Sequence, residues 1–78
     1  MKSDDVKLKF GKSLRAIRKE RGLSQEDLAH LVGLDRSYVG GVERGERNVS
    51  LENICRIARG LKIQPGTLMD FTRKWHEG

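Results

Sequence analysis

The feature that most limits the fold is the repeated spacing of apolar residues at steps of three and four. Val6, Phe10, Leu14 and Ile17 are spaced in this way, which places them along one face of an α-helix. No stretch of useful length alternates apolar and polar residues, as a half-buried strand would. The pattern therefore predicts an all-α fold, with five helical segments.

Glycines and capping residues divide the chain into these segments. The first helix is predicted over about 5–21 and ends at Gly22, which suits a left-handed C-terminal cap. A second helix begins at Ser24, whose hydroxyl can cap the first turn, and it ends at Gly33. The residues predicted to face inward from this helix are Leu28, Leu31 and Val32, with Ala29 closely packed.

A third, short helix is predicted over about 36–44, with Asp35 as its N-terminal cap and Gly45 at its end. Two short helices joined by a glycine-containing turn, here residues 33–35, have the geometry of a helix-turn-helix. The second helix of such a pair can lie in the major groove of DNA, which is wide enough to admit it. The inner face of this helix is predicted to consist of Val39 and Val42.

The last third of the chain predicts two more helices. Ser50 caps the fourth, and Pro65 suits the first position of a fifth helix over about 65–76, where no intrahelical N–H bond is lost. The chain has no repeat and no linker, which predicts a single domain over 1–78. The residues predicted to face inward from the fourth helix are Leu51, Ile54, Cys55, Ala58 and Leu61.

Composition narrows the class of partner. The 78 residues carry a net charge of +5, and a basic surface attracts polyanions such as nucleic acids. No apolar run is long enough to span a bilayer, and no signal peptide is recognisable, so a cytoplasmic protein without a membrane partner is expected. Cys55 is the one cysteine, and it is predicted to be a buried core thiol. No residues have metal-ligand spacing, so neither a metal nor a cofactor is expected.

The sequence gives no support for an enzyme. His30 falls on a helix and His76 in the C-terminal tail, where a histidine is more often a surface residue than a catalyst. No nucleophile and base are arranged as a set, and no glycine-rich loop follows a strand.

Three stretches resemble the lambda-repressor-like (XRE) helix-turn-helix family of phage repressors and Cro proteins. They are residues 24–29 (SQEDLA), 33–35 (GLD) and 42–45 (VERG), and the resemblance extends over about residues 7–71. Within that family, residues 34–51 are similar to the controller proteins of bacterial restriction–modification systems. This resemblance implies a five-helix fold and a small dimeric regulator that binds the operators of its own operon.

The outer face of the third helix carries side chains suited to reading bases. Arg36 can pair with guanine O6 and N7, which is worth about 1–3 kcal/mol of discrimination, and Ser37 can bond a base or touch a thymine methyl. Arg47 lies just beyond the helix, where it can reach a base or a phosphate, and the controller resemblance favours a base. Tyr38 allows two interpretations, a half-buried residue or a DNA contact. The predicted base contacts are Arg36, Ser37, Tyr38, Gly41 and Arg47.

Gly40 and Gly41 stand inside the third helix, where each costs about 1 kcal/mol relative to alanine. One hypothesis is that their missing side chains let the helix approach the groove closely. The alternative is that this position merely tolerates glycine.

Helix ends offer contacts for the DNA backbone. The free N–H groups at the start of the second helix suit a phosphate, Gln25 can add an amide donor, and the family resemblance implies such a clamp. Asn48 and Ser50 suit a second clamp at the fourth helix, although Ser50 can also act as a cap alone. The resemblance further implies an interior ion pair between Arg18 and Glu43. The predicted backbone contacts are Ser24, Gln25, Arg44, Asn48 and Ser50.

The last helix has more apolar surface than a terminal helix of a small domain needs. Its surplus predicts a two-fold interface, which sets two recognition helices one DNA turn apart on a palindromic operator. The alternative is that all of these residues belong to the core of one subunit. The predicted interface residues are Ile63, Leu68, Met69, Phe71 and Trp75.

Together these features predict a homodimeric, sequence-specific regulator that binds double-stranded DNA in a bacterium or phage, with RNA polymerase as a further candidate partner. The alternative is an antitoxin or phage-type repressor whose helix-turn-helix domain also binds a protein. The outward arginines on and after the third helix favour DNA, whose binding should weaken steeply with salt.

Overall fold

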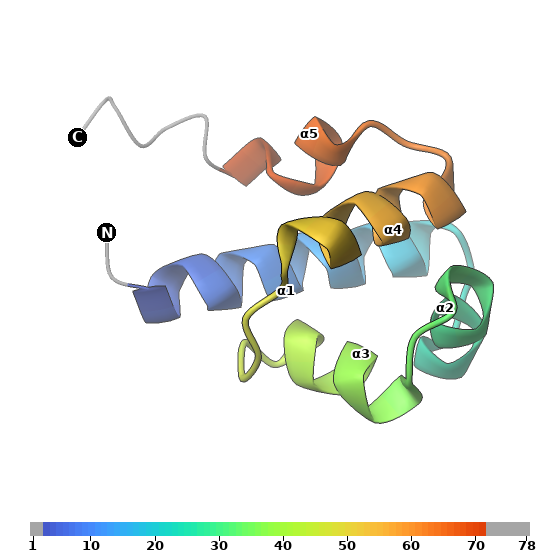
Figure 1. The fold of residues 1–78 in the computed structure, drawn as a ribbon, viewed down its shortest axis with the longest axis horizontal. Coiled ribbons are helices and arrows are strands. Elements are labelled where there is room, and N and C mark those ends of the chain that lie inside the picture. The colour runs from blue at the N-terminus through green and yellow to red at the C-terminus, as the bar shows by residue number, and fades with distance from the viewer. Residues whose placement is uncertain (1–2, 72–78) are drawn as a thin grey trace.

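The computed structural model describes residues 3–71, which form five helices (Figure 1). Over this range the chain contains no strand, and the predicted all-α class is confirmed. None of the helices in these residues is both long and apolar enough to cross a membrane. The helices are α1 (Ser3–Glu20), α2 (Gln25–Val32), α3 (Arg36–Glu43), α4 (Leu51–Leu61) and α5 (Pro65–Leu68).

One apolar core joins all five helices. α1 packs against α3 and α5, and α2 packs against both α3 and α4. Burying each leucine, isoleucine or valine removes its apolar surface from water, which contributes about 1.5–3 kcal/mol per side chain. The side chains that are almost completely buried are Leu14, Leu28, Val39, Val42, Ile57, Leu61 and Leu68.

The predicted caps account for most helix ends. The Ser24 hydroxyl accepts a bond from the Asp27 N–H at 2.9 Å, and the Ser50 hydroxyl accepts one from the Asn53 N–H at 3.0 Å. Gly33 closes α2 in the left-handed conformation, with a φ of 73°. α4 ends at Leu61, and its C-cap residue, Lys62, also has a positive φ of 58° although it is not glycine. The sequence offered no signal for that conformation.

Three residues predicted to face the core are exposed. Leu31 is 50% exposed, Leu51 is 81% exposed, and Cys55 is an exposed thiol. Successive residues lie about 100° apart around a helix, and the inner face of α4 centres on Ile57 and Leu61. Leu51 and Cys55 therefore fall to one side of it, and the same offset takes Leu31 off the inner face of α2.

The fifth helix is shorter than the prediction of about 65–76. α5 ends at Leu68, and Met69 leaves the helical conformation with a φ of −100° and a ψ of 14°. Leu68 is 0% exposed and belongs to the core of the single chain. Ile63, Met69 and Phe71 are partly buried against that core, whereas Trp75 lies outside the described residues.

Candidate nucleic-acid interface

α2 and α3 form a helix-turn-helix. The turn between them begins with Gly33 in the left-handed conformation, and Leu28, Ala29 and Val39 are buried where the two helices pack. α3 lies along the lower edge of the molecule, with α2 beside one end (Figure 1). The pair therefore packs as one unit that presents one side of α3 at the surface.

A buried ion pair fixes the C-terminal end of α3 to α1. The Arg18 guanidinium donates two hydrogen bonds to the Glu43 carboxylate, Nε to Oε2 at 2.6 Å and Nη2 to Oε1 at 3.0 Å. Its Nη1 also donates to the carbonyl of Leu23 at 2.8 Å. Hydrogen bonding to Glu43 raises the pKa of Arg18 despite the opposing effect of burial. Both side chains are satisfied, as buried charges must be.

Gln25 belongs to the same network, a connection that sequence reasoning missed. Its Nε2 donates to Glu43 Oε1 at 3.1 Å. An amide nitrogen carries two hydrogens, so this bond occupies one of them and fixes the direction of the other. Gln25 is the first residue of α2, and the predicted phosphate clamp is thus joined to the ion pair that holds α3.

The N-terminal end of α3 exposes its first two side chains. Arg36 and Ser37 are exposed, and the Ser37 hydroxyl donates to Asp35 Oδ2 at 2.9 Å. Asp35 occupies the N-cap position, but its side chain makes no capping hydrogen bond. The prediction that Asp35 is the N-cap residue is confirmed by its position, but its carboxylate accepts the serine hydroxyl and makes no bond to the backbone of the first turn.

Tyr38 is half-buried and is bonded within the protein. Its hydroxyl accepts a hydrogen bond from Asn53 Nδ2 at 3.1 Å and donates to the Asn48 carbonyl at 3.4 Å. The Arg47 guanidinium carbon lies 5.9 Å from the centre of the tyrosine ring. Tyr38 thus connects α3, the loop after it and the start of α4. Asn53 was missed because nothing in its local sequence points to so distant a partner.

The two glycines of α3 are buried and do not lie open to solvent. A β-carbon at Gly40 would lie 3.0 Å from Arg44 Nη1 and 3.3 Å from Gln25 Oε1. A β-carbon at Gly41 would lie 2.9 Å from Arg47 Cγ. Side chains from α2 and from the residues after α3 lie over both positions, so the hypothesis that the missing side chains let the helix approach the groove remains a prediction.

The remaining predicted DNA contacts, Arg44, Asn48 and Ser50, follow α3 in the chain. Arg44 Nε pairs with Glu46 Oε2 at 3.1 Å, and both side chains are more than half exposed. An exposed pair of this kind contributes less than about 1 kcal/mol, so it can open at little cost. Ser50 caps α4 as predicted, and Asn48 is exposed.

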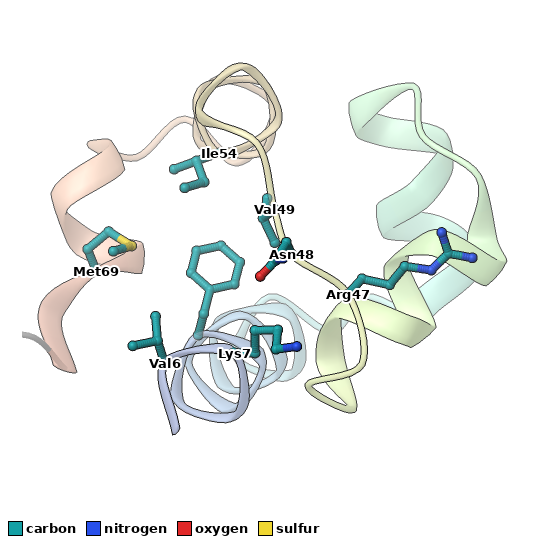
Figure 2. Close-up of a pocket in the computed structure, with 8 residues that line it drawn as sticks. Val6, Lys7, Arg47, Asn48, Val49, Ile54 and Met69 are labelled. Carbon is teal, nitrogen blue, oxygen red and sulfur yellow. The ribbon is translucent and has the colours of Figure 1, made fainter. Parts of the chain in front are cut away.

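A small pocket lies beside this surface and is lined mostly by apolar side chains. Its volume is about 100 Å³, whereas pockets for small molecules usually measure roughly 300–1,000 Å³. Arg47 is counted among its lining residues, but Figure 2 shows its side chain directed away, across α3. The exposed face of α3 is therefore a stronger candidate site. The other lining residues are Val6, Lys7, Phe10, Asn48, Val49, Ile54 and Met69.

Comparison with known proteins agrees with this geometry. Residues 14–68 match the helix-turn-helix family. Control protein C.BamHI of Bacillus amyloliquefaciens is 45% identical over 71 residues, which cover 90% of this chain and 88% of that one. The crystal structure of the restriction-modification controller protein C.AhdI from Aeromonas hydrophila is 61% identical, with a TM-score of 0.80, over 82% of this chain and 97% of that one.

A third related structure is that of the controller protein C.Esp1396I, solved as a tetramer in complex with its natural 35-base-pair operator. It is 34% identical with a TM-score of 0.77, and the match covers 87% of this chain and 90% of that one. These similarities extend over almost the whole chain and include its helix-turn-helix. The chain belongs to the helix-turn-helix family, among the restriction–modification controller proteins.

Proposed function

We propose that this protein is a sequence-specific regulator of transcription that binds double-stranded DNA and controls a restriction–modification operon. The observation that carries the proposal is the arrangement of α3. Its C-terminal end is fixed by the buried pair of Arg18 and Glu43, while Arg36 is exposed at its N-terminal end. A rigid helix with an exposed arginine at its start suits readout of the major groove.

Each predicted contact has a chemical role in this proposal. Arg36 pairs with guanine O6 and N7, while Ser37 and Arg47 contact neighbouring bases. Gln25 donates its second amide hydrogen to a phosphate, next to the free N–H groups at the start of α2. Further phosphate contacts come from Ser24, Arg44, Asn48 and Ser50.

The proposal includes a homodimer on a palindromic operator. Ile63, Met69 and Phe71 lie in and beyond the turn before α5 and remain only partly buried in one chain. A two-fold axis through this region brings the same patch of each subunit together. Because Leu68 is fully buried, the interface is proposed without it. The tetrameric operator complex of C.Esp1396I supports assembly on DNA.

In this proposal the protein binds DNA and catalyses no reaction. This function implies a bacterial or phage protein that acts in the cytoplasm, where its operator is. RNA polymerase is a proposed second partner, which in vitro transcription from the regulated promoter with purified protein would test.

The first experiment is selection of duplexes from a random library by the purified protein. The expected product is a palindrome whose two half-sites are centred about one helical turn, roughly 10 base pairs, apart. Its position in the genome would identify the regulated operon. Weak binding without any enriched sequence would contradict the proposal.

Salt dependence separates this function from that of a module that mainly binds another protein. Several phosphate contacts release counterions, so the affinity should fall steeply and linearly on a logarithmic scale as salt rises. An apolar protein contact would show little dependence. A flat salt response for the selected duplex would therefore favour a protein partner.

A further inference from the structure

The side chain of Arg47 folds back across α3. A β-carbon at Gly41 would lie 2.9 Å from Arg47 Cγ, 3.7 Å from Cδ and 3.4 Å from Nε. The first of these distances is shorter than van der Waals contact allows, so the aliphatic stem occupies the space that a side chain at position 41 would need. The Arg47 side chain, which Figure 2 shows directed across α3, therefore packs directly on Gly41.

The ring of Tyr38 lies beside the same arginine. The guanidinium carbon of Arg47 is 5.9 Å from the centre of the tyrosine ring, within the range of a cation–π contact. Asn53 on α4 donates to the tyrosine hydroxyl, which fixes the ring. Arg47 thus has two contacts that favour one orientation of its side chain, Gly41 beneath it and the Tyr38 ring beside it, although it comes from a loop.

We propose that Gly41 and Tyr38 are positioning residues for Arg47, which they hold over α3 in the orientation that reads DNA. A free arginine loses much side-chain entropy when it binds, and an arginine already held in its bound orientation loses less. The proposal rests on the proposed function, in which Arg47 contacts DNA. It assigns Gly41 an indirect role, in place of direct access to the groove.

The substitution Gly41→Ala tests this role without threatening the fold. The new methyl group meets only the flexible Arg47 side chain among its three nearest neighbours, so the stem can move away. Alanine also has a higher helix propensity than glycine. The variant should therefore have a melting temperature no lower than that of the wild type, while Arg47 is displaced from its position over Gly41 and beside Tyr38.

Gly40→Ala is the matched control. It makes the same chemical change one residue earlier in α3, but its methyl group meets Arg44 and Gln25 and lies away from Arg47. Any effect of helix propensity, or of a methyl group that keeps the helix from the groove, should appear in both variants. Because Gln25 and Arg44 are proposed phosphate contacts, Gly40→Ala should at most weaken binding to all duplexes alike. A loss of selectivity at the base pair read by Arg47 should appear only in Gly41→Ala.

The experiment measures the affinity of each variant for the duplex that the wild type selects, alone and combined with Arg47→Ala. Gly41→Ala should weaken binding about tenfold, within the range for one base contact, and should relax selectivity at the base pair read by Arg47. In the Arg47→Ala background it should have no further effect. The Tyr38→Leu variant loses the ring face together with the hydroxyl bonds to Asn53 and Asn48, and it should show the same loss of selectivity at that base pair.

Three results would overturn the proposal. They are unchanged affinity in Gly41→Ala, the same loss of selectivity at the base pair read by Arg47 in Gly40→Ala, or a full loss that persists when Arg47 is alanine. The last two would indicate that the glycines act by letting the helix approach the DNA. If the wild-type protein selects no duplex at all, it is the proposed function that fails, so the two failures are distinguishable.

Discussion

The two ends of α3 are held in different ways. At the C-terminal end, Glu43 is buried and accepts hydrogen bonds from Arg18 and Gln25. At the N-terminal end, Arg36 and Ser37 are exposed, and the serine bonds only to an aspartate two residues away. The C-terminal end thus sets the orientation of the helix, and the N-terminal end is available for contact with DNA. Substitutions at the first should change stability, and those at the second should change binding.

The largest effect is expected from Glu43→Ala, which removes the anchored end. Arg18 would remain buried without its partner, and Gln25 would lose its acceptor. Removing one member of a buried ion pair typically costs about 3–5 kcal/mol, a large fraction of the stability of a domain this small. Urea unfolding monitored by circular dichroism would measure the loss.

Glu46→Ala is the control for that loss, because Glu46 also pairs with an arginine, but at the surface. Its partner is Arg44, and both side chains are more than half exposed. The expected change in unfolding free energy is below about 1 kcal/mol. Equal destabilisation by both variants would show that burial does not distinguish the two pairs, and the comparison between the ends of α3 would fail.

The next largest effect is expected from Arg36→Ala, at the exposed end. Losing a bidentate contact with guanine should weaken binding to the selected duplex by about 1–3 kcal/mol, while the melting temperature stays near that of the wild type. Arg59→Ala, at an exposed position in the last turn of α4, removes the same charge from another helix. If both variants lose affinity equally, Arg36 contributes only general charge.

The difference between the two ends also explains what the sequence could predict. The positions of α1 to α4 and the caps at Ser24, Gly33 and Ser50 follow from local chemistry, and the structure confirms them, whereas α5 is shorter than predicted. The pairing of Arg18 with Glu43 came from a family resemblance, because local spacing does not relate residues 25 positions apart.

Other features depend on tertiary packing and were out of reach. The exposure of Cys55 and Leu51 depends on the rotation of α4 about its axis, which spacing of three and four does not settle at a helix end. The covering of Gly41 depends on where Arg47, six residues later, places its side chain. The bond from Asn53 to Tyr38 joins two helices and leaves no trace in either local pattern.

A smaller effect on stability is expected from substitutions at the start of α2. This helix begins with Gln25, which donates to Glu43 at the buried end of α3. Ser24 and Asp27 form a capping box, in which each side chain accepts a hydrogen bond from the backbone N–H of the other. Ser24→Ala should cost about 1 kcal/mol of stability. Thermal unfolding would measure it, with Ser24→Gly as a control that should cost only a few tenths of a kcal/mol. A loss as large as that in Glu43→Ala would contradict the ranking.

The smallest effect is a dependence on pH from the same capping box. The hydrogen bond from the Ser24 N–H lowers the pKa of Asp27 below its ordinary value of 3.8. The unfolded chain therefore binds this proton more readily than the folded one, so the contribution is complete above pH 3.8 and is lost as pH falls through the lower folded pKa. Asp27→Asn should reduce the melting temperature above that range and make its fall in acid shallower.

Glu26→Gln is the matched control, because Glu26 is exposed in the same turn and loses the same charge near the helix N-terminus. Both variants lose the favourable interaction of a carboxylate with the helix dipole, but only Asp27 also accepts the backbone bond of the capping box. The acid dependence of the melting temperature should therefore change more in Asp27→Asn. Identical pH profiles would mean that the interaction with the helix dipole alone accounts for the acid dependence. The start of α2 would then be stabilised by nearby charge, whereas the end of α3 is held by specific hydrogen bonds.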